Sequence, residues 1–312
     1  MKTYDIVTFG DLCVDLIMTG GDIVPRFGQV EQLVDSYSLE MGGSCSIFAC
    51  QAAKLGLRVG ILGCVGDDNF GELVIRRLEE CGVDTGYVRV DPTLKTGLGL
   101  ALCKDGDRAI LTYPGTLSAL TPADVTDEFL ASARHLHYGS FFLHTGLKPQ
   151  APEIVQRARD LGLSVSLDTN WDPDEAWNST LQAVLPRVNV FLPNEQEARF
   201  ISRRDSLSAA AVRLREQGVG LVAVKRGAAG AEVFAPEGHY VRNIAPADPG
   251  GDGIGAGDSF DAGFLAAWLR DMDVARSLEI ACRCGRSVAG RIGGLEGQPT
   301  WDEVTLKFDR QV

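Results

Sequence analysis

The chain lacks the features of several protein classes. No apolar run approaches the length of a membrane span, and the first residues enter a strand pattern without the apolar core of a signal peptide. Basic residues are in deficit: 30 Lys and Arg stand against 42 Asp and Glu, which leaves a formal charge of −12. This charge disfavours nucleic acid and anionic membranes as partners. We therefore expect a cytoplasmic protein that holds any anionic ligand by local backbone amides and metal.

Metal-site spacing is also missing. None of the eight cysteines forms a Cys-x-x-Cys pair, and Cys282-x-Cys284 has no second ligand pair with histidine nearby. Zinc is therefore not expected. Most cysteines lie in apolar runs, where a reduced cysteine acts as a small core residue.

The 312 residues, enough for one large domain, alternate short apolar runs with amphipathic helical patterns. The runs are apolar on both faces, which is typical of a parallel sheet covered by helices on each side. Strands are expected at 6–9, 59–65, 135–138, 164–167, 188–192 and 221–224. Helices are expected at 47–55, 70–81, 152–161, 195–201, 207–217, 259–269 and 274–291. These elements predict an α/β protein with a three-layer α/β/α fold, one domain over residues 1–312.

Two insertions break this alternation, at about residues 12–39 and 88–113. They contain four strand candidates, at 13–18, 32–39, 96–103 and 108–113, and the last two surround the hairpin-turn pair Asp105-Gly106. Because the first insertion leaves directly from the end of the first strand, we expect these strands to form a small β-sheet lid over the cleft. Ordinary edge strands are the alternative. Exposed lid edges favour a partner, so we expect a homodimer through the lid.

The most informative stretch is Gly-Gly-Asp-Gly-Ile-Gly-Ala-Gly-Asp-Ser-Phe, from Gly250 to Phe260, which leads into a helix. Its alternate glycines allow a tight turn and bring backbone amides close to a ligand. The helix directs its positive N-terminal dipole at the same place, which predicts an anion site suited to phosphate. Asp258 beside this site is either a base for phosphoryl transfer or a helix cap.

Several strand candidates end in polar or glycine-rich residues, and such ends meet in one cleft of an open α/β sheet. They are Gly10-Asp11, Asp168-Thr169-Asn170, Pro193-Asn194-Glu195 and Lys225-Arg226-Gly227. Asn194 and Glu197 fit a capping box, although a carboxylate at this place could also hold Mg²⁺ through water. Asp15, inside an apolar strand, either faces solvent or accepts hydroxyl hydrogens in the cleft. Asp168 and Asn170 are interpreted similarly, with loop capping as the alternative.

In order and character these pieces resemble the ribokinase-like (PfkB) carbohydrate kinase family, over almost the whole chain. Two stretches of the chain together resemble the family's N-terminal signature. The first is Gly42-Gly43 before a helix, and the second is Val65-Gly66-Asp67-Asp68-Asn69-Phe70-Gly71. Residues Asp252 to Gly263 resemble the family's C-terminal signature, and Asn194-x-x-Glu197 resembles its magnesium motif. A Rossmann-type dehydrogenase would instead carry its glycine loop after the first strand, where this chain has Gly10-Asp11.

The resemblance implies a role for each matching residue. Catalysis would use Asp258 as the base and Gly255, Ala256 and Gly257 as the anion hole. Mg²⁺ would be held through water by Glu197. ATP would be contacted by Asn194, Lys225, Gly227, Cys282 and Gly285. The sugar pocket would include Asp15, Gly42, Gly43, Ile47, Asp168 and Asn170.

Two departures from the family pattern bear on the substrate. Gly253 and Ile254 replace hydroxyl residues that often precede the glycine motif, which leaves the use of a monovalent cation open. Ile47 replaces a sugar-binding Asn, so either the pocket is less polar than usual or Ser44 or Ser46 has taken over the hydrogen bond.

The resemblance implies an ATP-dependent kinase for a hydroxyl, most simply a primary one, of a sugar or sugar derivative. A nucleoside kinase is the rival within the family, and a catalytically silent sugar-binding or regulatory protein is the rival outside it. A sugar-phosphate kinase is disfavoured, because no Lys stands next to the glycine motif.

Overall fold

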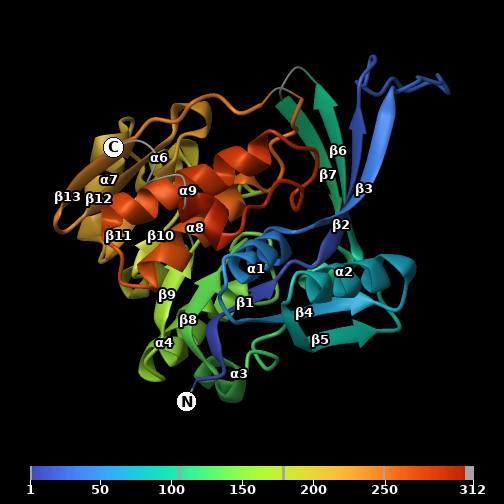
Figure 1. Ribbon diagram of the computed structural model, residues 1–312. Coiled ribbons are helices and arrows are strands. Elements are labelled where there is room, and N and C mark those ends of the chain that lie inside the picture. The colour runs from blue at the N-terminus through green and yellow to red at the C-terminus, as the bar shows by residue number, and fades with distance from the viewer. Residues whose placement is uncertain (1, 105–106, 178–179, 249, 306–312) are drawn as a thin grey trace.

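A computed structural model of the chain describes residues 2–104, 107–177, 180–248 and 250–305. Nine of the described strands form the main sheet, in the order β13-β12-β11-β10-β9-β8-β1-β4-β5 (Figure 1). From β11 to β5 all neighbours are parallel, and β12 and β13 are added antiparallel at one edge. The strands are β1 (Tyr4–Gly10), β4 (Val59–Gly66), β5 (Asp84–Asp91), β8 (Ala133–Tyr138), β9 (Ser164–Leu167), β10 (Val190–Phe191), β11 (Leu221–Lys225), β12 (Ala231–Ala235) and β13 (Gly238–Arg242).

Two groups of helices cover the two faces of this sheet, because side chains alternate in direction along each strand. Ile6 and Ala223 pack with one group, whereas Val7 and Val222 pack with the other. The first group is α1 (Ser44–Lys54), α2 (Asn69–Glu80), α8 (Ala256–Trp268), α9 (Val274–Ala289) and α10 (Trp301–Thr305). The second is α3 (Asp127–Ala131), α4 (Ala151–Asp160), α5 (Leu181–Val184), α6 (Glu195–Ser202) and α7 (Leu207–Glu216). The three-layer α/β/α fold expected from the sequence is confirmed.

The inserted strands form a second sheet of four strands, in the order β3-β2-β6-β7, which rises from the main body at the upper right of Figure 1. Its strands are β2 (Cys13–Thr19), β3 (Ser36–Gly42), β6 (Gly97–Lys104) and β7 (Asp107–Tyr113). The boundaries differ from expectation, since residues 88–91 belong to β5 of the main sheet and the strand expected at 32–39 lies at 36–42. The turn expected at Asp105-Gly106 lies outside the described residues.

One face of the small sheet is apolar on all four strands. The register places Leu16 beside Leu39 and Leu100, and Leu100 beside Leu111. Strand alternation puts Val14, Met18, Tyr37, Met41, Leu98, Leu102, Ala109 and Tyr113 on the same face. Its outer strands are open to solvent: Leu39 is 40% exposed and Leu111 is 61% exposed. The opposite face carries Asp15.

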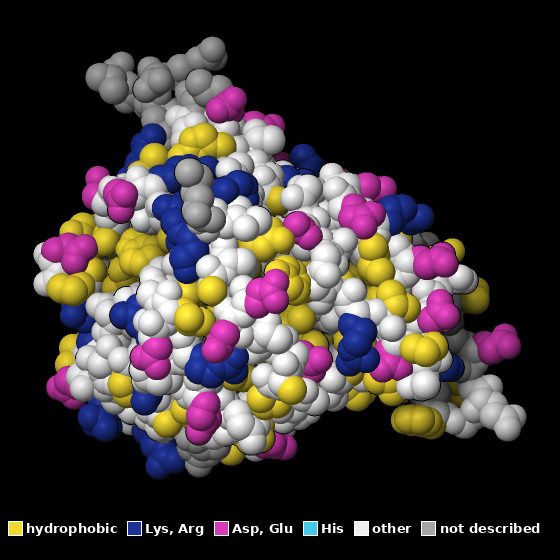
Figure 2. Space-filling model, turned by 90° about the horizontal axis from the view of Figure 1, so that it is seen from below, with side chains coloured by type: hydrophobic (Ala, Val, Ile, Leu, Met, Phe, Trp, Pro, Cys, Tyr) yellow, Lys and Arg dark blue, Asp and Glu magenta, His cyan; other side chains and the backbone are white. Residues whose placement is uncertain are grey.

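Basic and acidic side chains are interspersed over most of the face that Figure 2 shows, and several basic side chains gather in the upper part of this view. None of the helices in the described part of the chain combines the length and the apolar character that a bilayer crossing requires.

Candidate active site

The glycine loop leads directly into α8, as expected from the sequence. Gly253 and Gly255 have φ values of +70° and +72°, which favour glycine. A Cβ on Gly255 would lie 2.6 Å from the Cα of Gly294, so close packing requires glycine there as well. The carboxylate of Asp252 holds the loop, because it accepts hydrogen bonds from the amides of Ile254 and Gly293 at 2.9 Å each.

Asp258 lies in the first turn of α8, one turn after the glycine loop. The N-cap of the helix is Gly255, so the alternative that Asp258 caps α8 is wrong. The pKa of Asp258 is raised to about 7, mainly by burial and next by Asp168, against the opposing effects of Lys225 and a hydrogen bond to Ser44. A carboxyl group with this pKa changes its protonation state near neutral pH, which suits a general base.

The N-terminus of α1 meets the same place from the other side. Asp11 accepts hydrogen bonds from the amides of Ser44 and Cys45, at 2.8 and 3.0 Å, and from the hydroxyl of Ser140 at 2.9 Å. Asn170 donates from Nδ2 to the hydroxyl oxygens of Ser44 and Ser140, at 2.8 and 2.9 Å. The ends of β1, β8 and β9 are thus linked to α1, and Ser44 is held beside Asp258.

Asp15 lies between two glycines of the small sheet. A Cβ on Gly42 or on Gly99 would lie 2.4 Å from atoms of the Asp15 carboxyl group, so both positions leave room for it. Burial raises the pKa of Asp15 to about 6, with a further contribution from Asp11, while Arg108 lowers it. Asp15 therefore lies on the cleft side of the sheet. Of the two expected placements, facing solvent or facing the cleft, this is the second.

The inserted sheet touches the glycine loop through β7. Arg108 donates from Nη1 to the carbonyl oxygen of Asp252 at 3.1 Å. Gly43 is the N-cap of α1 with φ +88°, and a Cβ there would lie 2.2 Å from the Asp11 carbonyl oxygen. Gly42 and Gly43 thus allow β3, β2 and α1 to meet at the cleft.

Asp168 and Lys225 meet at the ends of β9 and β11. The Lys225 Nζ lies 3.0 Å from Oδ2 of Asp168 and 3.0 Å from Oδ2 of Asp261 on α8. Both carboxyl groups are almost fully buried. The resemblance implies a substrate contact for Asp168 and an ATP contact for Lys225, and in the structure the charged groups of these two residues bind each other. Any contact of Lys225 with a nucleotide would come from its backbone.

Asn194 and Glu197 form the capping box of α6. The Asn194 side chain accepts from the Glu197 amide at 2.9 Å, and the Glu197 carboxylate accepts from the Asn194 amide at 2.9 Å and from its Nδ2 at 2.6 Å. Burial raises the pKa of Glu197 to about 7, with Asp168 adding to the effect and Lys225 opposing it. The capping role of Asn194 and Glu197 is confirmed. The raised pKa indicates that the positive charge near the Glu197 carboxylate does not offset its burial.

The remaining expected residues surround these groups. Gly227 follows β11 with φ +54°, and a Cβ there would meet open space. Cys282 is buried in α9, and a Cβ on Gly285 would lie 2.9 Å from the Ala256 carbonyl oxygen, so Gly285 lets α9 pack under the first turn of α8. Ile47 is 2% exposed and packs with Ile17, Ala101 and Ile254.

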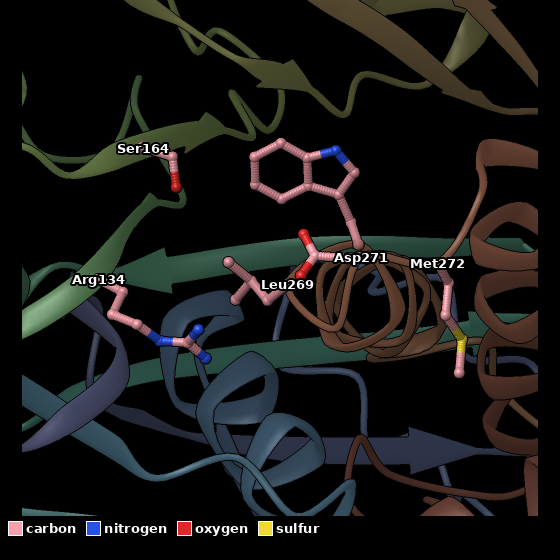
Figure 3. A pocket seen from close by; sticks show the side chains of 6 residues that line it. Arg134, Ser164, Leu269, Asp271 and Met272 are labelled. Carbon is pink, nitrogen blue, oxygen red and sulfur yellow. The ribbon is translucent and has the colours of Figure 1, made fainter.

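A pocket of about 450 Å³ lies away from this cleft (Figure 3). Arg134 and Ser164, which line it, stand at the amino-terminal ends of β8 and β9, and Asp271 follows the C-terminal end of α8. The catalytic groups expected from the sequence lie at the opposite ends of these elements.

Sequence reasoning did not assign Asp261, Ser140 or Arg108 to the site. Asp261 could have been found, since a carboxylate between buried apolar residues of a helix requires a partner. Ser140 has φ +49° just after β8, and no sequence pattern marks it. Arg108 reaches the site only because β7 pairs with β6.

Comparison with known proteins agrees with this geometry. The sequence model described as pfkB family carbohydrate kinase matches residues 3–301. The chain belongs to the pfkB family. An ATP-dependent ribose-1-phosphate kinase of Halopiger xanaduensis is 35% identical over 266 residues, which cover 84% of each chain. Fructokinase-2 of Solanum habrochaites is 25% identical, over 96% of this chain and 94% of that one.

Solved structures confirm the fold of this pfkB family member. An E. coli protein assigned as ribokinase II superposes with a TM-score of 0.87 at 24% identity, covering 98% of this chain and 99% of that one. Its complex with ATP and Mg²⁺ gives a TM-score of 0.84 at 25% identity with the same coverage. The pfkB protein described here is an ATP-dependent carbohydrate kinase.

Proposed function

We propose that this kinase transfers a phosphoryl group from ATP to a hydroxyl, most simply a primary one, of a sugar or sugar derivative bound between Asp15 and Asp258. The observation that carries the proposal is the carboxyl group of Asp258, with a pKa near 7, at the N-terminus of α8 and directly after a glycine loop. A silent sugar-binding protein would need neither this base nor an anion site beside it.

The residues divide the chemistry as follows. An oxygen of the ionised Asp258 takes the proton from the substrate hydroxyl as that oxygen attacks the phosphoryl group. The amides of Gly255, Ala256 and Gly257 lie at the start of α8, where no carbonyl oxygen within the helix can accept from them, and Ala256 makes only a long bond of 3.4 Å to the Gly253 carbonyl oxygen. They stabilise the charge on the transferring group. Asp15 accepts hydrogen bonds from sugar hydroxyls, and Asn170 orients Ser44 next to Asp258.

Glu197 fits the metal role that the resemblance implies. Its carboxylate is buried and has a pKa of about 7, which indicates that it lacks a counter-charge. Mg²⁺ would neutralise charge on the ATP phosphates. Glu197 would hold this ion through water, with Asn194 fixing the carboxylate by two hydrogen bonds. Gly227, Cys282 and Gly285 would contact the rest of the nucleotide.

The substrate is tested with an ADP-release assay over sugars, deoxy sugars, sugar acids and nucleosides, with and without K⁺. Ile47 makes the lid side of the pocket apolar, and Ser46 is buried with its hydroxyl bonded to the Gly43 carbonyl oxygen, so Ser44 alone can replace the usual Asn. We expect substrates with a missing hydroxyl to compete well against ribose and fructose. A preference for ribose or fructose would contradict this role of Ile47, and a preference for adenosine would identify a nucleoside kinase.

Ribose 1-phosphate belongs in the same panel because a relative is named for it. Arg108 brings a cation to the sugar side of the cleft, whereas Asp15, Asp252 and Glu40 make that side acidic. A neutral sugar therefore fits the charges better than a sugar phosphate. The protein's surplus of negative charge fits a cytoplasmic enzyme.

Replacing the base tests the mechanism. Asp258→Asn should lower kcat by about 10²–10⁴-fold, because the general base is lost, while ATP binding changes little. In the unmodified enzyme kcat should rise with pH through about 7, since burial raises the pKa of Asp258 and only its ionised form accepts a proton. Steady-state kinetics and nucleotide titration measure both effects. Wild-type turnover in the variant would exclude Asp258 as the base.

Glu197→Gln separates the metal role from the capping role. Gln can still accept the Asn194 backbone amide in the capping box but loses the second acceptor oxygen, so the free energy of unfolding should fall by about 1 kcal/mol. The Mg²⁺ concentration for half-maximal rate should rise, because the neutral side chain attracts hydrated Mg²⁺ less strongly. Urea unfolding and a Mg²⁺ titration of the rate provide the two readouts. An unchanged Mg²⁺ dependence would leave only the capping role.

The apolar face of the small sheet supports a homodimer through the lid. Part of this face, with Val14 and Met41, is buried in the main core, but Leu39 and Leu111 on the outer strands are exposed, and exposed apolar strand residues favour an interface. Leu111→Glu places a charge on the exposed part of that face, on the outer strand β7, and should convert a dimer to a monomer in sedimentation experiments at micromolar concentration. Val212→Glu, at an exposed apolar position of α7, is the matched control. A monomeric and fully active unmodified protein would rule out this assembly.

A further inference from the structure

The cluster of Lys225, Asp168 and Asp261 is buried beside the catalytic groups, and the proposed mechanism does not use it. The side chain of Lys225 is 14% exposed, that of Asp168 is 4% exposed and that of Asp261 is 0% exposed. Each carboxyl group lies 3.0 Å from the ammonium nitrogen. A Cβ built on Gly257 would lie 3.7 Å from the same nitrogen, so the ammonium group stands directly beneath the backbone of the anion hole.

The hydrogen bonds within the cluster distinguish the two carboxyl groups. Asp168 is satisfied as a carboxylate, since Oδ2 binds Lys225 and Oδ1 accepts from the Asn170 amide at 3.3 Å. Oδ1 of Asp261 is fully buried and has no hydrogen-bond partner among the described residues. An ionised oxygen without a donor is costly in such a place. Two carboxylates that share one cation also repel each other, which favours a proton on one of them.

The pKa shifts of the three residues also place the proton on Asp261 and the positive charge on Lys225. Burial raises the pKa of Asp261 well above its usual range. For Asp168 burial acts in that direction too, but Lys225 and hydrogen bonds lower the pKa below its ordinary value. Burial opposes a charge on Lys225, yet the carboxyl groups of Asp168, Asp261, Glu197 and Asp258 raise its pKa. The remaining titratable group facing the cluster is His137, which interacts with Asp168 and Lys225 and whose pKa burial lowers to about 3.

We propose that Asp168 and Asp261 are positioning residues that keep Lys225 charged beneath the anion hole, with one proton stored on Asp261. The fixed positive charge then supports the transferring phosphoryl group through the backbone of Gly257. Because Asp261 lies three residues after Asp258, the same contact holds α8 against the ends of β9 and β11. This proposal rests on the proposed function, since it concerns the anion hole of that site.

Lys225→Met tests the charge. Turnover should fall at least about tenfold with little change in the KM for ATP. The loss should persist on the high-pH plateau of the variant's own kcat profile, whose midpoint rises because Lys225 lowers the pKa of Asp258. The single variant leaves Asp168 buried without its cation and is expected to be unstable. The double variant Lys225→Met, Asp168→Asn removes that unpaired charge, so its stability should recover while kcat stays low. Recovery of wild-type kcat in the double variant would show a purely structural cluster and overturn the proposal.

Asp261→Asn tests the proton and does not depend on the folding of the Lys225 variants. Asn resembles a protonated carboxyl group, so kcat should stay within about threefold and the rise of kcat with pH should keep its midpoint. The infrared band of a buried protonated carboxyl group should be lost. A midpoint lowered by about one pH unit, or an unchanged infrared spectrum, would show that Asp261 is not the protonated group and contradict its assignment.

Two comparisons separate the possible failures. Arg213→Met removes an ion-paired cation from the surface of α7 and should leave kcat unchanged. If no compound in the substrate panel is phosphorylated, the proposed function fails, and the infrared measurement still decides where the proton lies. If a substrate is found and Lys225→Met turns it over normally, the positioning network fails while the kinase assignment stands.

Discussion

In the proposed mechanism, the catalytic end of the molecule depends on keeping one carboxylate next to a site that binds anions. Asp258 and a phosphate repel each other, so positive charge has to be supplied locally, all the more because the chain as a whole carries −12. The N-terminal dipole of α8 supplies part of it, and Lys225 lies beneath the same turn. Burial and Asp168 balance these effects and leave Asp258 with a pKa near 7. A base of this kind is strong enough to accept a proton and is still partly ionised at neutral pH.

This electrostatic balance depends on the position of α8 within about an ångström, and packing fixes that position. A Cβ on Gly263 would lie 2.8 Å from the sulfur of Cys284 on α9, so the two helices are in close backbone contact. Phe264 is fully buried against the sheet. At the N-terminal end, Gly255 touches Gly294 and Ile47, and Asp252 anchors the loop. The core therefore determines where the base and the anion hole stand.

The fold and most of the site could be predicted from the sequence because their patterns are local. Paired glycines, a carboxylate at the start of a helix and apolar runs of strand length are visible without tertiary structure. The partner of Lys225 was not visible, since Asp168, Lys225 and Asp261 come from three elements that meet only in the folded chain. Edge strands such as β13, with mostly exposed residues, gave no apolar pattern to detect. Asn194 and Glu197 show a different limit of the sequence. The same pair of residues fits a helix cap and a Mg²⁺ site, and the sequence pattern does not distinguish the two.

The two faces of the small sheet carry the proposed sugar ligand Asp15 and the proposed dimer surface. Asp15 is on the inner strand β2, and on the other face of the sheet Leu16 of this strand pairs with Leu39, which is exposed, and with Leu100, which is half-buried. Burying those leucines would restrict β2 and thereby hold Asp15 between Gly42 and Gly99. The same sheet reaches the glycine loop through Arg108, which binds the Asp252 carbonyl oxygen. A contact on the apolar face would therefore stabilise both the sugar side and the phosphate side of the cleft, because one sheet carries residues for each.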